Sequence, residues 1–188
     1  MIIDMKVYAM LANGFEIAEA TLPIDILRRA GIQTVTVSIT DEDVVTASNG
    51  IPVIADQVLP ASDLSDGDMI FLPGGMPGST NLSQCAALAE YINEYNAAGK
   101  YLAAVCAAPM VYGLMGLLQG KKATCYPGFE DKLLGADFQK KSCILDGNII
   151  TACGAGVGYQ LGHQMVTVLA GKEVADTVLQ KMMYQVYE

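Results

Sequence analysis

The sequence predicts an α/β fold, a doubly wound and mostly parallel sheet sandwiched by helices. Strand-like apolar runs alternate with helix-like runs, which is the pattern of a parallel sheet covered on both faces. Hydrophobic residues make up 52% of the 188 residues and charged residues 16%, which indicates a heavily buried sheet. No linker long enough to separate two units is present, so residues 1–188 are expected to form a single domain.

The expected strands follow apolar and β-branched runs, and turn residues end most of them. They lie at residues 6–11, 34–39, 69–72, 101–105, 123–126 and 148–152. Residues 44–55 are expected to form a small hairpin, because Asn49-Gly50 favours a tight hairpin turn. Helices are expected at about residues 15–30, 83–97, 157–169 and 173–184, with one more beginning near 107 and a short one near 129–134. Pro23 is expected to kink the first helix and Gly31 to end it. This alternation is typical of a flavodoxin-like fold.

The charge pattern excludes some classes of partner. A net charge of −9, with the few basic residues scattered, argues against nucleic acid, because phosphate binding needs a basic surface. The expected partner is therefore a small molecule or a second copy of the chain. Residues 101–118 carry no charge, but Pro109 and Gly113 favour a buried strand followed by a helix rather than a membrane span. Residues 1–6 lack the pattern of a secretory signal, which favours a cytoplasmic protein.

The five cysteines do not form a metal-binding motif. None are spaced as Cys-x-x-Cys and the chain has one histidine, so no metal site and no cofactor are expected. An odd number of cysteines without a secretory signal favours reduced thiols in the cytosol. Most of them are expected to be small buried side chains.

Three strand ends carry small or glycine-rich turns that belong on one edge of a doubly wound sheet. They are Pro73-Gly74-Gly75, the segment 105–109, and Gly154-Ala155-Gly156. Only the second presents a nucleophile, Cys106, followed by a helix start with Pro109 in its first turn. A thiol there faces free backbone N–H groups and the positive end of a helix dipole, which predicts a lowered pKa. The alternative is that Cys106 packs in the core, and spacing alone does not decide between the two.

Two carboxylates lie at the start of the first expected helix. Glu16 and Glu19 are three residues apart and therefore share a helix face. If Glu19 is buried near Cys106, it should stay protonated and donate a hydrogen bond to the thiolate, because two anions at that range repel. The alternative is that both glutamates are solvated charges favoured by the helix dipole.

Four motifs together resemble a known family. Residues 13–19 (Asn-Gly-Phe-Glu-Ile-Ala-Glu), 23–31 (Pro-Ile-Asp-Ile-Leu-Arg-Arg-Ala-Gly), 72–75 (Leu-Pro-Gly-Gly) and 104–109 (Ala-Val-Cys-Ala-Ala-Pro) are similar to the DJ/ThiJ/PfpI superfamily. Within it they resemble most the branch of the Parkinsonism-associated protein deglycase. The likeness covers essentially the whole chain, with the motifs in order and at similar spacing.

The resemblance implies roles for particular residues. Cys106 matches the nucleophile, Glu19 its partner carboxylic acid, and the backbone N–H groups of Gly75 and Ala107 the oxyanion-binding pair. The substrate pocket implied lies at Glu16, Gly74, Tyr126 and Gly154. Members of this branch form homodimers through the first helix and neighbouring elements, so a homodimer is expected.

The chain departs from the family pattern where relatives carry a histidine. Tyr126 and Ala107 stand at positions where different relatives have one, and Ala155 and Val157 replace a common Pro and Thr. The single histidine, His163, flanks the apolar stripe of its helix and is expected to be packed or interfacial rather than catalytic. A Cys–His hydrolase is therefore hard to build.

Two functions of different classes remain from the sequence. The first is a cofactor-free enzyme of glyoxalase or deglycase type that converts methylglyoxal to lactate through a Cys106 thiolate and a protonated Glu19. The second is an oxidative-stress sensor or chaperone in which Cys106 oxidises to sulfinate without substrate turnover. An amidase or peptidase is disfavoured by the missing histidine.

Overall fold

The computed structural model describes residues 4–184 and has one central seven-stranded sheet with the order β10-β11-β7-β6-β1-β2-β5. Its strands are β1 (Lys6–Leu11), β2 (Gln33–Ser38), β5 (Gln57–Val58), β6 (Met69–Leu72), β7 (Tyr101–Val105), β10 (Cys143–Asp146) and β11 (Ile149–Ala152). All neighbouring pairs are parallel except β10 with β11. The predicted doubly wound, mostly parallel fold is confirmed.

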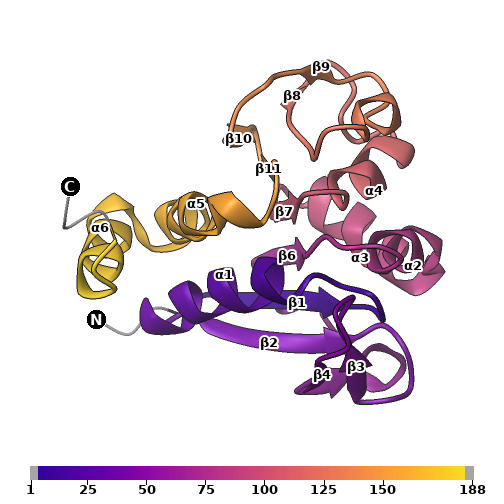
Figure 1. Ribbon diagram of the computed structural model, residues 1–188, viewed down its shortest axis with the longest axis horizontal. Helices are drawn as coiled ribbons and strands as arrows, with labels where there is room; N and C mark the ends of the chain where they lie inside the picture. Colours follow the sequence, from indigo (N-terminus) through magenta and orange to yellow (C-terminus); the bar gives the residue numbers. More distant parts are fainter. Residues whose placement is uncertain (1–3, 185–188) are drawn as a thin grey trace.

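Within residues 4–184, six α-helices cover the two faces of the sheet (Figure 1). They are α1 (Ile17–Arg29), α2 (Gly78–Gln84), α3 (Ala86–Ala97), α4 (Pro109–Leu114), α5 (Gly158–Ala170) and α6 (Lys172–Lys181). Helices α1, α5 and α6 share one apolar cluster with the sheet, and α2, α3 and α4 share the other. Successive strand residues point to opposite faces, so Phe71 joins the first cluster while Ile70 and Leu72 join the second. This burial on both faces explains the continuous apolar runs of the central strands.

The structure differs from the predicted elements in several places. The expected helix over 83–97 is two helices, because Cys85 between them has an extended backbone with ψ of 100°. The expected strand over 123–126 shortens to β8 (Lys122–Ala123), which pairs with β9 (Asp137–Phe138) outside the main sheet. The edge strand β10 was not predicted, since its single antiparallel neighbour leaves it partly exposed and its sequence weakly patterned. Helix α1 continues through Pro23 to Arg29, one residue before the turn at Ala30.

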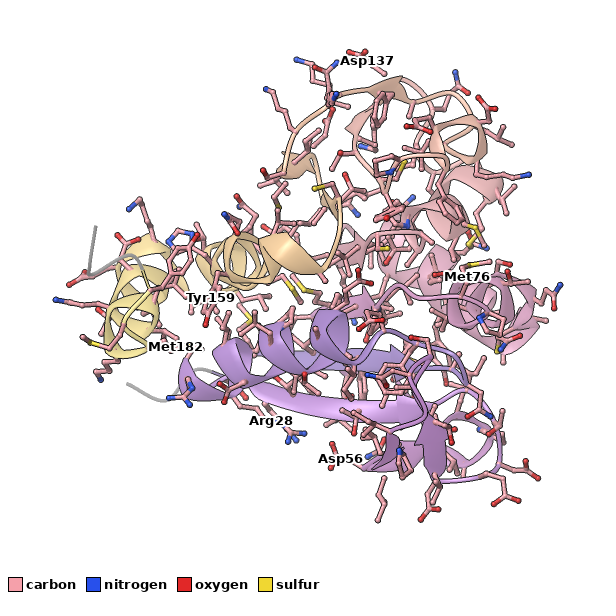
Figure 2. All side chains as sticks on the ribbon, viewed as in Figure 1. Arg28, Asp56, Met76, Asp137, Tyr159 and Met182 are labelled. Carbon is pink, nitrogen blue, oxygen red and sulfur yellow. The ribbon has the colours of Figure 1, made fainter. Side chains whose placement is uncertain are left out.

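The predicted hairpin over 44–55 is present as β3 (Val44–Thr46) and β4 (Pro52–Ile54). It folds against the start of α1, because Ser48 N–H donates to the carbonyl of Phe15 at 2.8 Å. Near the far end of α1, Arg28 reaches Asp56 just after the hairpin, at 2.8 Å (Figure 2). The hairpin is thereby held beside the first turn of α1, which carries Glu19.

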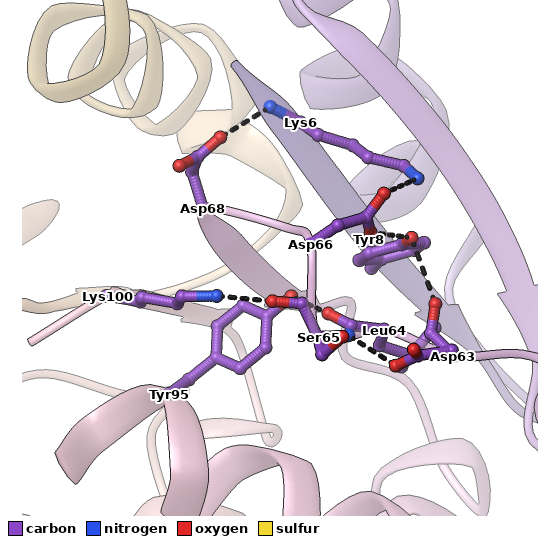
Figure 3. Close-up of polar contacts among 9 residues, drawn as sticks. All are labelled: Lys6, Tyr8, Asp63, Leu64, Ser65, Asp66, Asp68, Tyr95 and Lys100. Carbon is purple, nitrogen blue, oxygen red and sulfur yellow. Dashed lines mark hydrogen bonds and ion pairs between the residues drawn. The ribbon is translucent and has the colours of Figure 1, made fainter. Parts of the chain in front are cut away.

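A polar network closes the edge of the sheet opposite to the strand carboxyl ends (Figure 3). The Tyr8 hydroxyl donates to Asp66 at 2.6 Å, and Lys6 Nζ contacts the same carboxylate at 2.8 Å. The Tyr95 hydroxyl of α3 donates to the carbonyl of Leu64, and Lys100 Nζ donates to that of Ser65 at 2.6 Å. The connection before β6 is therefore tied to both β1 and α3.

The uncharged stretch 101–118 forms β7 and the short helix α4, as predicted. Within residues 4–184 no helix is both long and apolar enough to cross a membrane.

Candidate active site

Cys106 directly follows β7 with a strained backbone. Its φ is +64°, and within residues 4–184 only Met183 among the other non-glycine residues also has a positive φ. A non-glycine residue in this region costs free energy and is typical of a sharp strand-to-helix turn that presents a nucleophile. The turn is fixed on both sides: Cys106 N–H donates to Ala152 of β11 at 2.9 Å, and its carbonyl accepts from Tyr126 N–H at 2.9 Å. Pro109 occupies the first turn of α4, as predicted.

Two backbone N–H groups face the sulfur of Cys106. They belong to Gly75, after β6, and to Ala107, and their hydrogen bonds lower the pKa of the thiol. Gly75 has φ of +90°, and a Cβ there would lie 2.4 Å from the backbone nitrogen of Glu16. Only glycine fits this approach without a shift of the backbone. The parallel neighbours β6 and β7 thus bring the two donors predicted from the sequence to one atom.

Glu19 lies in the first turn of α1 and is 3% exposed. The interpretation in which both glutamates are solvated is therefore wrong for Glu19. Its Oε2 is buried without a well-formed hydrogen bond within the described residues. Burial raises the pKa of the carboxyl from 4.5 to about 7, with a smaller increase from the negative charge of Glu16. The Cys106 thiol and the N–H groups of Gly74 and Ala155 act in the opposite direction without overcoming burial.

The predicted lowering of the Cys106 pKa is wrong for the free site. Burial raises the pKa of the thiol to about 12, and the neighbouring Glu19 adds to the increase, which outweighs the two N–H groups. Because the two acids interact strongly, they titrate as a pair. The pair loses its first proton near pH 7 and holds the second through the physiological range. Above pH 7 the pair therefore carries one negative charge, on Glu19, and the remaining proton lies on the Cys106 sulfur.

Gly74 separates the two members of this pair. A Cβ at Gly74 would lie 2.3 Å from Glu19 Oε2 and 2.5 Å from Cys106 Cβ. Real Cβ atoms do not approach other atoms this closely, so the absence of a side chain at Gly74 is what lets carboxyl and thiol meet.

Glu16 precedes α1 and is partly exposed beside the pair. Its N–H donates to the carbonyl of Gly74 at 2.9 Å, and its carboxylate accepts from the Ser48 hydroxyl at 3.0 Å. Ser48 is a site neighbour that the sequence analysis missed. It lies in the hairpin turn, and no sequence pattern indicates which turn residue reaches α1.

Tyr126 and Gly154 form one wall of the site. A Cβ at Gly154 would lie 3.5 Å from the Tyr126 ring and 4.0 Å from Glu19 Oε1. Tyr126 is 51% exposed, so its ring borders solvent. All eight residues predicted for the site are thus brought to the carboxyl edge of β1, β6, β7 and β11.

His163 lies outside this site. Its Nε2 is 2.7 Å from Asp176 of α6, and Asp176 also contacts Lys172. The predicted packed or interfacial position agrees with this placement. Within residues 4–184 no group of three or more His, Cys, Asp or Glu side chains is arranged to hold a metal ion.

The chain as a whole has counterparts among known proteins. A model of the DJ-1/PfpI family matches residues 5–168. The chain belongs to the DJ-1/PfpI family. The resemblance inferred from the sequence motifs is therefore confirmed. A solved structure of Toxoplasma gondii DJ-1, oxidized, superposes with a TM-score of 0.92 at 35% identity, covering 96% of this chain and 99% of that one.

Curated relatives of this DJ-1/PfpI chain differ in length. Protein DJ-1 homolog B of Arabidopsis thaliana is 40% identical over 174 residues, 90% of this chain but 39% of that protein. The chain thus spans about two-fifths of that relative. Parkinson disease protein 7 homolog of Danio rerio is 32% identical, over 92% of this chain and 94% of its own length. Glutathione-independent glyoxalase DJR-1.2 of Caenorhabditis elegans is 26% identical, over 84% of each chain.

Proposed function

We propose that this protein is a cofactor-free glyoxalase that converts small α-oxoaldehydes such as methylglyoxal to hydroxy acids. The observation that carries the proposal is the meeting of three features at one point: the positive φ of Cys106, the N–H groups of Gly75 and Ala107, and the buried carboxyl of Glu19. The glyoxalase name of the C. elegans relative supports the same reaction class.

The reaction begins when the proton of the pair moves to Glu19 and the Cys106 thiolate adds to the aldehyde carbon. The N–H groups of Gly75 and Ala107 stabilise the oxyanion, and a preformed pair of donors contributes roughly 3–4 kcal/mol. Glu19 then protonates that oxygen, which gives a hemithioacetal and leaves a Glu19 carboxylate.

Glu19 next moves a proton between the two carbons of the substrate. Its carboxylate takes the proton of the former aldehyde carbon, forming an enediolate, and returns it to the adjacent carbon, while the hydroxyl proton passes from the oxygen of the first carbon to that of the second. The product is a hydroxyacyl thioester on Cys106, so the aldehyde is oxidised and the ketone reduced within one molecule. Water hydrolyses the thioester, releasing lactate from methylglyoxal and restoring the thiol. A positioned acid–base group of this kind typically contributes a factor of about 10²–10⁴.

The charge of the site favours uncharged substrates. Glu16 and the anionic pair place negative charge around the sulfur, and like charges repel. Neutral α-oxoaldehydes, and the early sugar–amine adducts on which a deglycase acts, fit this environment better than carboxylated carbonyl compounds.

The test is lactate formation from methylglyoxal by the wild type, Cys106→Ser and Glu19→Gln. We expect loss of lactate in Cys106→Ser and a decrease of about 10²-fold or more in Glu19→Gln. His163→Ala serves as the control, because His163 lies outside the site, and it should retain the wild-type rate. Equal rates in all four proteins would overturn the proposal.

A second candidate is an oxidative-stress sensor, and the accessibility of the strained Cys106 favours it. Cys106 is only partly buried, and the related Toxoplasma gondii structure is of the oxidized protein. The buried Glu19 carboxyl can donate a hydrogen bond to a sulfinate on Cys106. Mass spectrometry after mild peroxide, combined with the lactate assay, separates the functions: addition of two oxygens at Cys106 without turnover supports the sensor alone.

We also propose a homodimer and a cytoplasmic location. The hairpin exposes Val44, Ile51 and Ile54, the last of them 72% exposed, beside a groove between α1 and β4. Apolar side chains gathered in this way are typical of an interface between protein chains. Sedimentation of the wild type and Ile54→Asp tests the dimer, which the substitution should weaken. All five cysteines are free thiols, which fits a reducing compartment.

A further inference from the structure

We propose that Cys125 and Cys153 are a reversible disulfide site that lies directly behind the Tyr126–Gly154 wall of the active site. The proposal concerns two thiols that the reaction above does not use. It stands whether or not the protein is a glyoxalase.

The two cysteines line one cavity. This cavity measures about 400 Å³ and is also bordered by Thr124, Ser142 and Phe138. Cys125 is buried, whereas Cys153 is partly exposed. An oxidant that enters the cavity therefore reaches Cys153 first, and Cys125 lines the same cavity.

The residues that flank the two cysteines touch each other. Thr124 N–H donates to the Thr151 hydroxyl at 3.0 Å, and the ring of Tyr126 lies against Gly154. The segments 124–126 and 151–154 therefore run side by side in the same direction. Each cysteine lies between the contacting residues of its own segment, and the proposed bridge requires the two Cα atoms to lie about 4.4–6.8 Å apart.

The chemistry assigns different roles to the two thiols. Burial raises the pKa of Cys125 to about 11, with smaller increases from the negative charge of Glu130 and, last, from Cys153. Cys125 therefore remains a thiol while the more accessible Cys153 reacts first. The Cys153 thiolate attacks a hydroperoxide, the O–O bond breaks, and an alcohol or water leaves. Cys125 then attacks the resulting sulfenic acid, and water leaves as the disulfide forms.

Cys143 is the alternative partner of Cys153, and its orientation disfavours it. It pairs with Ala152 in the antiparallel register of β10 and β11, so its side chain points to the same face as Ala152. Successive residues point to opposite faces, so Cys153 points away from Cys143. Cys143 lines a different cavity, beside His163. Cys143→Ser is therefore the matched control.

A Cys125–Cys153 bridge would act on the active site through the backbone. Tyr126 N–H donates to the carbonyl of Cys106, and Gly154 lies near Glu19. Each cysteine precedes one of these two residues, so a bridge fixes the wall that borders the substrate.

The experiment treats the full chain carrying Cys106→Ser with hydrogen peroxide, blocks free thiols with N-ethylmaleimide, and digests with trypsin without reduction. Cleavage after lysine places Cys125 in peptide 123–132, and Cys143 with Cys153 in peptide 142–172. We expect these two peptides linked with the loss of two hydrogens, separated by dithiothreitol. The link should persist in Cys143→Ser and be lost in Cys153→Ser.

Two results would overturn the proposal. One is that Cys125 and Cys153 stay fully labelled by N-ethylmaleimide at peroxide concentrations that oxidise Cys106 in the wild type. The other is a link that survives in Cys153→Ser, which would assign the bridge to Cys143. Cys153 is partly exposed, so its replacement by serine should leave the fold intact, and circular dichroism of the variant checks this.

Discussion

Glu19 and Cys106 meet across Gly74, which leaves room for no side chain between carboxyl and thiol. A Cβ at this glycine would lie 2.3 Å from Glu19 Oε2 and 2.5 Å from Cys106 Cβ. The two groups come from α1 and from the end of β7, so the turn after β6 controls their approach. The distance between acid and nucleophile is thus set by a residue that has no side chain of its own.

Gly74→Ala is expected to abolish turnover and to destabilise the protein by about 1–3 kcal/mol, because the added methyl group must displace Glu19 or Cys106. Lactate assays and urea unfolding measure the two effects. Gly156→Ala is the matched control, since nothing lies within 4 Å of a Cβ there and its φ is not positive. Wild-type activity in Gly74→Ala would show that the close approach of acid and thiol is dispensable.

Glu19 makes the stability of the protein depend on pH. Burial raises its pKa from 4.5 to about 7, so the native state binds this proton more tightly than the unfolded chain. Its contribution is fully present below pH 4.5 and is lost as the pH rises through 7, a change of about 3 kcal/mol. Glu19→Gln should remove this decrease, so the free energies of unfolding of wild type and variant should converge at low pH. Urea unfolding of both proteins between pH 4 and 8 measures this difference in pH dependence. If the two free energies of unfolding change in parallel with pH, a buried Glu19 carboxyl with a raised pKa is contradicted.

The alkylation rate of Cys106 should report the pair rather than an isolated thiol. In the wild type we expect alkylation to rise only well above neutral pH, because burial and then the neighbouring Glu19 raise the pKa of the thiol to about 12. In Glu19→Gln the rise should move to lower pH, because the charge that disfavours the thiolate is gone. Iodoacetamide labelling between pH 5 and 10, followed at the Cys106 peptide, measures both profiles. A profile in the variant that lies at the same or a higher pH than in the wild type would contradict the effect of Glu19 on the thiol.

The network at the opposite edge of the sheet should affect stability without affecting chemistry. Tyr8→Phe removes the hydroxyl that donates to Asp66 at 2.6 Å and should cost about 1–2 kcal/mol of unfolding free energy. Thermal unfolding measures the loss, and the lactate assay should stay at the wild-type rate. Tyr101→Phe is the control, because within residues 4–184 its hydroxyl makes no hydrogen bond. A fall in kcat for Tyr8→Phe would indicate coupling to the site.

The central strands could be predicted because each carries its own signal. Lys6–Leu11, Met69–Leu72 and Tyr101–Val105 are found as predicted, since strands buried on both faces are apolar throughout. The elements that the sequence did not indicate lie where apolar patterning or helix propensity is weak. Helix α2 begins with Gly78-Ser79-Thr80-Asn81, which has low helix propensity, and β10 is partly exposed at the sheet edge.

The sequence by itself determined where the central strands lie, which turns follow them and which of these turns carries the nucleophile. It could do so because turn residues and apolar runs act locally. It also supplied the motifs that place the chain in its family. Only the tertiary structure decided the protonation of the site: burial of Glu19 and Cys106 together raises both pKa values, so the expected thiolate beside a protonated Glu19 becomes a thiol beside a carboxyl with a pKa of about 7. Desolvation depends on everything packed around a group, and in this chain those neighbours come from α1, β6, β7 and β11, which lie far apart in the sequence.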